Sequence, residues 1–454
     1  MNLKPVNTKK SGALCWAALA CLVVPMFASY FFDDMFSTVS HIFGRPEALE
    51  LGWDARDFGN FIGDYSLLCV CGGLIIGGIL LDIFGVRVMG SVFLAMMVGG
   101  GVMIYLGVAS GLPKESAIAL GRIGRMFFGL GSEIAGVAVT RSTAKWFKGR
   151  NMSFAMGLQL AIARAGTATA LIAAPLIVGI PKDFYSLKDT ARPALIGLFL
   201  LLAGAVVWAI FVALDAGFDR REGIVRARGE VQDEDKFRFK DIAGLLRNPR
   251  FLMIGILCVT FYCCVSSFKK FGTAVVIPRF GIDPAIAGTM VSMIPFFTII
   301  FTPLFGALVD RTGHATRWMA GGSIAVLTGH MLITFAPQGA QLFGYAGIGL
   351  LGLGYSLVPS AMWPSVPRIV PERNLGTAYS LIYWIQNIGL FFVPKAVGRI
   401  LASDPGLNGA ARTEHLFIGL ALMAIAVASM LMHSSDAHPE LHLDTARANE
   451  NKTE

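Results

Sequence analysis

Apolar runs of about 20 residues recur along the whole chain and are separated by short polar connections. A helix of that length crosses the hydrocarbon core of a bilayer, which is about 30 Å thick. The runs lack the polar face of a helix on the surface of a soluble protein. The pattern therefore predicts an all-α membrane protein with twelve transmembrane helices. We place the spans near residues 12–36, 58–81, 88–110, 116–140, 152–179, 193–215, 251–274, 284–308, 318–336, 340–364, 375–402 and 414–433.

A segment rich in charges of both signs, DRREGIVRARGEVQDEDKFRFKD, divides these spans into two groups of six. We expect an N-terminal six-helix half (1–215), a charged cytoplasmic linker (216–250) and a C-terminal six-helix half (251–433). The polar tail (434–454) has the composition of a disordered segment.

The composition agrees with this picture, since 55% of the residues are hydrophobic and 15% are charged, against about 25% charged in soluble domains. The net charge of +8 does not predict a nucleic-acid partner, because Lys and Arg gather in the N-terminus, the linker and alternate loops. This distribution predicts that both termini are cytoplasmic. We expect a multi-pass monomer in a lipid bilayer. The N-terminus has no acidic dileucine sorting signal, which favours a bacterial inner membrane over a lysosome. An accessory subunit is not predictable.

The two halves repeat one another. The loop GGILLDIFGVR after span 2 corresponds to FGALVDRTGHATR after span 8. The matching positions are Gly78, Asp82 and Gly85 in the first half, and Gly306, Asp310 and Gly313 in the second. Parallel six-span repeats with a site between them are typical of transporters.

These Gly-x-x-x-Asp-x-x-Gly loops, with Arg125-x-x-x-Gly129-x-Gly131 in span 4, resemble the motifs of the major facilitator superfamily. The resemblance implies two pseudo-symmetric six-helix halves that alternate access to a central site. In the first loop, Ile83 stands at the position where the superfamily motif usually has a basic residue. The second loop has the basic residue Arg311 at that position. We expect gating contacts at loops and helix ends that favour the inward-closed state, from Asp82 and Asp310 together with Arg87, Arg125 and Arg141.

Glu133 in span 4 and Arg164 in span 5 lie at similar depth near the middle of the membrane. Each charge alone costs about 2.5–3.5 kcal/mol at the centre of a helix in lipid. They could form a permanent ion pair that joins the spans, or they could bind the ammonium and carboxylate of a zwitterion. The repeat places Ser356 and Asn387 at the corresponding positions of the second half. Only the first half therefore carries this charged pair, which favours the binding of a substrate with two different ends over a structural ion pair.

The segments GRMFFGLGSE, GLQLAIARAG, MWPSVPRIVPERNLGTAYS and IQNIGL are similar to the lysosomal dipeptide uniporters of the superfamily and their bacterial relatives. In that family the span-4 glutamate and span-5 arginine bind the amino and carboxyl ends of the peptide. The resemblance implies the same roles for Glu133 and Arg164. It also implies that dipeptide transport is not coupled to the movement of protons. An extended dipeptide, about 7 Å long, would reach between the two groups.

Polar and aromatic side chains in spans 7, 10 and 11 are candidates for the rest of the site. A desolvated peptide amide needs hydrogen-bond partners, which these side chains could supply. Each could equally pack between helices. The candidates are Tyr262, Trp363, Tyr383, Gln386 and Asn387.

Span 1 ends with Asp33 and Asp34, and the repeat places Lys269 and Lys270 of span 7 at the corresponding depth. The lysines depart from the family pattern, in which neutral residues are expected. We predict an external gate in which the acids and bases pair while the cavity is open to the inside. The charges could instead be solvated helix ends, or the lysines could attract an anionic substrate.

Two other functions remain open. One is an amino-acid or small carboxylate carrier that uses Arg164 with the two lysines, with possible proton coupling through Glu133. The other is a membrane sensor or scaffold that binds a ligand without moving it. No residue constellation predicts an enzyme, a cofactor or a metal site. His330 in span 9 is a lone histidine, and we expect it to have a structural partner.

Overall fold

The computed structural model of the chain describes residues 12–41, 53–147, 152–180, 187–221, 239–371, 374–438 and 443–445. The described residues form helices and no strands. The first half contains α1 (Gly12–Asp34), η1 (Ser37–Val39), α2 (Ala55–Asp64), η3 (Cys69–Gly73), α3 (Leu74–Ala109), α4 (Lys114–Phe147), α5 (Met152–Val178) and α6 (Leu187–Arg221). The second contains α8 (Pro249–Phe280), α9 (Pro284–Thr312), α10 (Ala315–Phe335), α11 (Gln341–Ile369), α12 (Leu375–Ser403) and α13 (Leu407–Ala437), preceded by the short α7 (Phe239–Arg247).

Ten stretches of the described chain are long and apolar enough to cross a membrane. The comparably long α4 and α12 complete twelve: α4 carries Arg122, Arg125 and Glu133, and α12 carries Lys395 and Arg399. Span 2 is not one continuous α-helix. It consists of α2, the π-helical turn η3 and the first residues of α3. The helices extend past some predicted spans, as in α6, since a helix continues beyond its apolar centre into the polar boundary of the bilayer.

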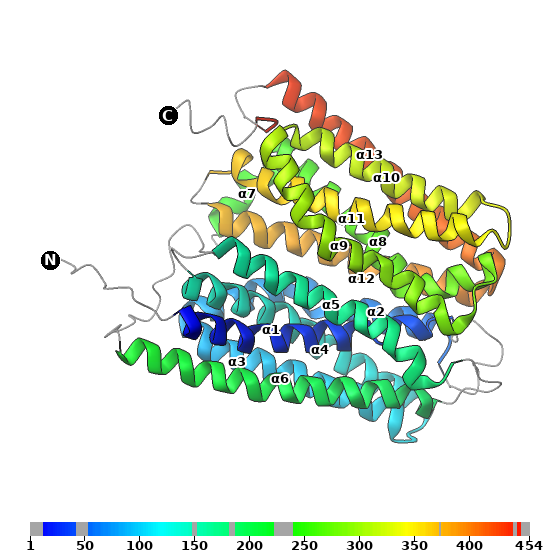
Figure 1. Cartoon of the computed structure of the whole chain (residues 1–454), viewed down its shortest axis with the longest axis horizontal. Helices are drawn as coiled ribbons and strands as arrows, with labels where there is room; N and C mark the ends of the chain where they lie inside the picture. The colour runs from blue at the N-terminus through cyan, green and yellow to red at the C-terminus, as the bar shows by residue number, and fades with distance from the viewer. Residues whose placement is uncertain are drawn as a thin grey trace.

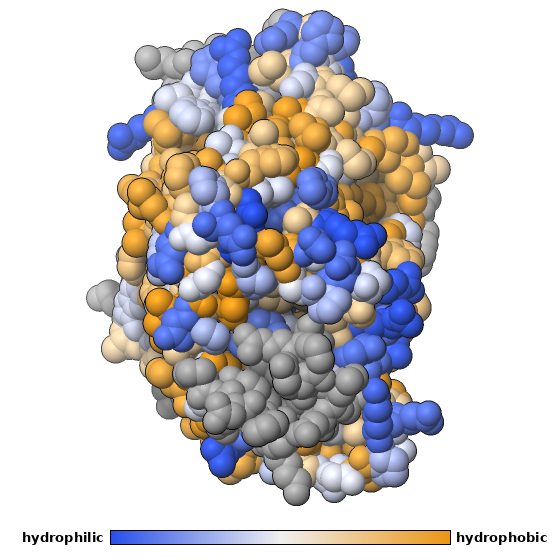
Figure 2. Space-filling model, turned by 90° about the vertical axis from the view of Figure 1, so that its right-hand side faces the viewer, coloured by the Kyte–Doolittle hydropathy of each residue, from blue (hydrophilic) through white to orange (hydrophobic). Residues whose placement is uncertain are grey.

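The two halves form two layers of helices. In Figure 1, α1 and α3 to α6 lie in one layer, and α8 to α11 and α13 lie in the other. Along the boundary, α5 packs on α9 and α2 packs on α12. We call the end of the bundle where α1 begins and α13 ends the terminus side, and the opposite end the far side. Figure 2 looks onto the far side, where hydrophilic residues gather on the end while hydrophobic residues cover the flanks.

The repeated loops adopt the same turn in both halves. Gly85 has a φ of 78° and Gly313 a φ of 66°, a region that glycine adopts without steric cost. Each glycine turns the chain between consecutive spans on the terminus side. The sequence match between these loops is therefore also a match in backbone conformation.

Part of the tail that we expected to be disordered is docked on the second half. Leu443 is buried, and the carboxylate of Asp444 accepts hydrogen bonds from Ser435 and from both the backbone and the side chain of Thr316. The reason is that α10 begins after His314 without a side-chain cap of its own, so its first N–H groups need an acceptor. The prediction was wrong for residues 443–445. Residues 439–442 and 446–454, and residues 222–238 of the linker, lie outside the described chain.

Candidate functional site

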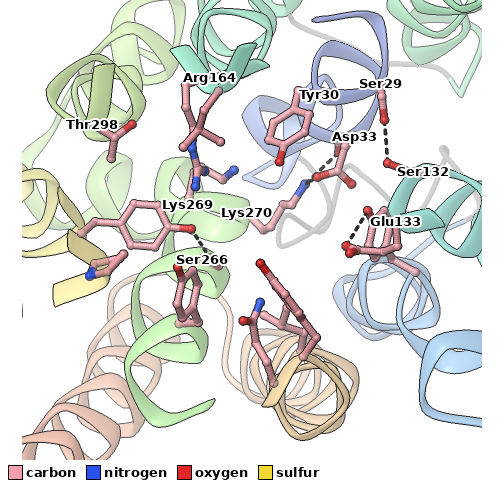
Figure 3. A pocket seen from close by; sticks show the side chains of 18 of the residues that line it. Ser29, Tyr30, Asp33, Ser132, Glu133, Arg164, Ser266, Lys269, Lys270 and Thr298 are labelled. Carbon is pink, nitrogen blue, oxygen red and sulfur yellow. Dashed lines mark hydrogen bonds and ion pairs between the residues drawn. The ribbon is translucent and has the colours of Figure 1, made fainter. Parts of the chain in front are cut away.

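A cavity of about 610 Å³ lies between the halves and is not enclosed. Its walls come from α1, α2, α4 and α5 of the first half and from α8, α9, α11 and α12 of the second. Acidic and basic side chains reach this cavity from the first half, and two lysines reach it from the second (Figure 3).

Glu133 reaches the cavity from α4. The Tyr65 hydroxyl donates a hydrogen bond to its Oε1 at 3.1 Å. Close packing just before it fixes this part of α4, since a Cβ on Gly129 would overlap the carbonyl oxygen of Tyr65, and one on Gly131 would lie 2.6 Å from the amide of Met97. The GLG sequence therefore lets α4 approach its neighbours and directs the next charged side chain into the cavity.

Arg164 reaches the cavity from α5. Its guanidinium carbon lies 5.2 Å from the ring centre of Tyr355 and 5.9 Å from that of Tyr30. Within the described chain, no carboxylate forms an ion pair with Arg164. Figure 3 shows Glu133 and Arg164 on opposite sides of the cavity. The interpretation of a permanent ion pair between spans 4 and 5 is therefore wrong.

Four of the five wall candidates line the cavity, namely Tyr262, Trp363, Tyr383 and Gln386. The indole N–H of Trp363 donates to the Tyr262 hydroxyl at 3.1 Å, and its ring stacks on Tyr383 with centres 4.9 Å apart. Asn387 does not line the cavity: it is buried, and its amide donates to the Tyr383 carbonyl at 3.0 Å. Adjacent residues of a helix point about 100° apart, and here Gln386 faces the cavity while Asn387 points into the packed interior. Their roles in binding stay predictions.

The acids of span 1 and the lysines of span 7 meet at the far end of the cavity. Lys269 Nζ lies 2.8 Å from Asp34 Oδ2, and Lys270 Nζ lies 2.7 Å from both Asp33 Oδ2 and Asp34 Oδ1. These ion pairs join α1 to α8 across the two halves. We call the four side chains the far-side cluster.

Arg125 belongs beside this cluster and not at a helix end, so the expected position of this residue was wrong. Its guanidinium donates to Asp33 Oδ1 at 2.6 Å and lies 5.1 Å from the ring centres of Phe61 and Tyr65. The physical reason is that α4 starts on the far side at Lys114, so a residue three turns later is still in the far half of the membrane.

Among the other predicted gating residues, Arg87, Asp310 and Arg311 form no ion pair between the halves within the described chain. Arg87 pairs with Asp215 and Asp219 of α6, within its own half. Asp310 and Arg311 are exposed, and no ion pair links either to a described residue. Arg141 is half-buried near the terminus-side end of α4. The side chain of Asp82 lies outside the part that the structure describes.

Glycine contacts show which side is closed. On the far side, a Cβ on Gly59 would lie 2.7 Å from the Cα of Gly398, and one on Gly288 would overlap the carbonyl oxygen of Leu171, across the halves in both cases. On the terminus side, a Cβ on Gly78 or Gly306 would meet nothing within 4 Å. The halves therefore touch on the far side, whereas these two terminus-side glycines are not packed against the other half.

A second ion cluster between the halves was not predicted from the sequence. Asp64 at the end of α2 is fully buried, 2.6 Å from Lys395 of α12 and 2.5 Å from Arg122 of α4. A charge inside an apolar span was the signal that drew attention to Glu133, and the same signal is present here. His330 is partnered as expected, by Glu414 of α13 at 2.8 Å, although that partner was not predicted.

Comparison with known proteins agrees with this architecture. The family model of the Major Facilitator Superfamily matches residues 19–394. The lysosomal dipeptide transporter MFSD1 of Danio rerio is 30% identical over 380 residues, covering 83% of this chain and 78% of the relative. The human protein of the same name is 30% identical over 330 residues, covering 72% and 68%.

Solved structures with this fold share little sequence with the chain. The POT family transporter PepTSo has a TM-score of 0.69 and 14% identity, covering 94% of this chain and 99% of that one. The nucleoside transporter NupG has a TM-score of 0.61 and 13% identity, covering 92% and 98%. With twelve spans in two repeated halves and a family match over most of its length, this chain is a multi-pass membrane protein that belongs to the major facilitator superfamily.

Proposed function

We propose that the protein carries dipeptides across the membrane by alternating access. The observation that supports this most is the placement of one acid and one base, Glu133 and Arg164, on opposite sides of one cavity between the halves. Neither pairs with the other, so a ligand with an ammonium at one end and a carboxylate at the other satisfies both. A guanidinium binds a carboxylate with two parallel hydrogen bonds, and a carboxylate binds an ammonium as an ion pair.

The relatives support the same substrate, since proteins about 30% identical to this chain are named dipeptide transporters. Uniport is the simplest mechanism for such a site, because the substrate itself neutralises the two charges. The aromatic and amide side chains of α8, α11 and α12 then contact the peptide between its ends. Peptide binding favours whichever conformation brings these contacts together, as any shift between two states requires.

We assign the terminus side to the cytoplasm, because the loops there carry most of the lysine and arginine residues. The conformation described is then open to the inside and closed to the outside. The far-side cluster and the cluster around Asp64 are the ion pairs that must separate for the cavity to open outward. A single copy of the chain contains the complete cavity, which fits a monomeric carrier.

An organic anion carrier is the second candidate. Four cationic side chains line the cavity, those of Arg125, Arg164, Lys269 and Lys270, against the two acids Asp33 and Glu133. This excess of positive charge favours carboxylate ligands. Such a carrier needs no free ammonium on its substrate, whereas the proposed dipeptide carrier does.

Thermal-shift binding of purified protein, followed by counterflow in liposomes, tests the proposal. The ligands are a dipeptide, its N-acetyl derivative, an amino acid and a dicarboxylate. We expect the dipeptide to bind best, and Glu133→Gln and Arg164→Ala to weaken it about tenfold to a hundredfold, as for a lost charged hydrogen bond. The exposed residues Glu115 and Arg412 supply matched controls, Glu115→Gln and Arg412→Ala.

Equal binding of the dipeptide by wild type and both site variants contradicts the assignment of the site. Preference for the dicarboxylate or the N-acetyl derivative favours the anion carrier. Binding without counterflow favours a sensor or scaffold.

A further inference from the structure

The two lysines of the far-side cluster are held differently. Lys270 Nζ donates to Asp33 Oδ2 at 2.7 Å and to the backbone carbonyl of Asp33 at 2.8 Å, and it forms an ion pair with Asp34 Oδ1 at 2.7 Å. An ammonium group has three N–H donors, and three acceptor oxygens surround that of Lys270. Lys269 Nζ has one acceptor among the described residues, Asp34 Oδ2 at 2.8 Å. Two of its N–H donors are therefore available to another acceptor.

Asp34 does not depend on Lys269 alone. Its Oδ1 also accepts from Lys270, and its Oδ2 also accepts from the Thr167 hydroxyl at 2.7 Å. Asp34 is fully buried and does not line the cavity. If Lys269 moved away, the Asp34 carboxylate would keep one cation and two hydroxyl donors, those of Thr167 and of Ser37, whose Oγ lies 3.4 Å from Asp34 Oδ1.

Lys269 does line the cavity, on the same side as Arg164 (Figure 3). The guanidinium carbon of Arg164 lies 5.2 Å from the ring centre of Tyr355, and Figure 3 shows Lys269 next to Arg164 at the cavity wall. Arg164 has no carboxylate partner in the described chain. An anion between these two cations would pair with both.

We propose that Lys269 is a second binding residue for the carboxylate of the substrate, and that it exchanges Asp34 for this carboxylate when substrate binds. The inference rests on the proposed function, in which Arg164 binds the carboxyl end of a dipeptide. Lys270 takes no part in the exchange, because its three donors stay with Asp33 and Asp34.

The exchange links an occupied site to the opening of the far side. Three ion pairs join the lysines to the acids across the halves, and the exchange breaks the one between Lys269 and Asp34. The halves are then held by fewer charges at the far side when the cavity is loaded than when it is empty. Binding of substrate thereby lowers the barrier to outward opening.

The first test compares a dipeptide with its C-terminal amide, which keeps the ammonium and loses the carboxylate. Wild type should prefer the free acid. In Lys269→Gln this preference should fall about tenfold or more, the usual effect of losing a charged hydrogen bond. Affinity for the amide should stay within about twofold, because the amide never used the lysine charge. Lys270→Gln is the matched control. It should weaken the ion pairs of the far-side cluster but leave the ratio of the affinities for the free acid and the amide as in wild type.

The outcomes separate this inference from the proposed function. If wild type binds neither the acid nor the amide, the dipeptide function itself is contradicted. If wild type prefers the acid and Lys269→Gln keeps that preference, Lys269 is a gate residue only and the exchange is contradicted. An equal loss of preference in both lysine variants also contradicts it, since that result assigns the effect to the charge of the cavity as a whole.

A second test does not change the lysine. Asp34→Asn removes the acid that competes for Lys269, so the free acid should bind severalfold tighter while affinity for the amide is unchanged. Asp33→Asn, the matched control, loosens the cluster through Lys270 and Arg125 and should leave the ratio as in wild type. A similar ratio in both aspartate variants contradicts competition at Lys269. This test decides alone if Lys269→Gln does not fold.

Discussion

The buried pair of His330 and Glu414 shows how this bundle holds a charge that lies outside the cavity. The imidazole Nδ1 and the carboxylate Oε2 are 2.8 Å apart, and both side chains are fully buried between α10 and α13. The rings of Phe268 and Phe417 pack against the imidazole. Since Phe268 directly precedes the two lysines, the pair supports the part of α8 that carries half of the far-side cluster.

Removing one member of this pair should therefore destabilise the fold. In His330→Ala the Glu414 carboxylate is left without its partner, and we expect the free energy of unfolding to fall by about 3–5 kcal/mol. Thermal unfolding in detergent measures the effect. His415→Ala, at the exposed neighbouring position, is the control and should change stability little. Equal melting of the two variants would show that the buried contact adds nothing to stability.

Among the helices, the crossing of α2 and α12 determines how closely the halves approach on the far side. The backbones meet at two glycines, where a Cβ on Gly59 would lie 2.7 Å from both the Cα of Gly398 and the Pro394 carbonyl oxygen. Backbone atoms cannot rotate away as a flexible side chain can. The glycines therefore permit the far-side closure that places Asp64 beside Lys395.

Gly59→Ala should destabilise the conformation closed on the far side. Overpacking at such a crossing costs about 1–3 kcal/mol. We expect a lower melting temperature and slower counterflow, because the carrier spends less time open to the terminus side. Gly419→Ala on α13, where a Cβ meets nothing within 4 Å, is the matched control. Unchanged counterflow in Gly59→Ala would mean that this crossing does not limit the transport cycle.

The helices and their repeat were predictable because each depends on a local pattern. Hydrophobic length identified the spans, and the two loop motifs identified the turns at Gly85 and Gly313. Charges inside apolar spans pointed to the cavity, which Glu133, Arg164 and both lysines line. Such charges are costly in lipid, so their presence in a sequence is informative by itself.

The missing parts of the site depend on the rotation and contact of distant helices, which no local pattern encodes. Gln386 faces the cavity and Asn387 does not, although the two are adjacent in sequence and similar in chemistry. Arg125 lies beside Asp33 because of the depth at which α4 begins. Asp64 and Lys395 are 331 residues apart in the chain, and their pairing follows only from the crossing of α2 and α12.

For the molecule as a whole, transport requires that the far-side contact between the halves be broken and re-formed. The hydroxyls of Ser40 and Thr273 meet at 2.8 Å across the halves. In a double variant, Ser40→Cys with Thr273→Cys, the two sulfur atoms are within reach of a disulfide. Oxidation should stop counterflow and reduction should restore it, while dipeptide binding in detergent persists.

Each single cysteine variant, treated with the same oxidant, controls for the seven native cysteines, all of which are free thiols. Continued exchange after the cross-link has formed would mean that substrate crosses without separation of the halves on the far side. Loss of binding as well as exchange would mean that the closed far side is not the state that accepts substrate from the terminus side.

The docked segment around Asp444 has a consequence for the order in which the protein matures. The backbone of Thr316 at the start of α10 is capped by a carboxylate 128 residues later in the chain, and the amide of His314 donates to the carbonyl of the same aspartate. During synthesis α10 enters the bilayer long before residue 444 has left the ribosome. The cap on the first turn of α10 thus comes from a residue that follows α11, α12 and α13 in the chain, so it can form only after all three helices have been synthesised.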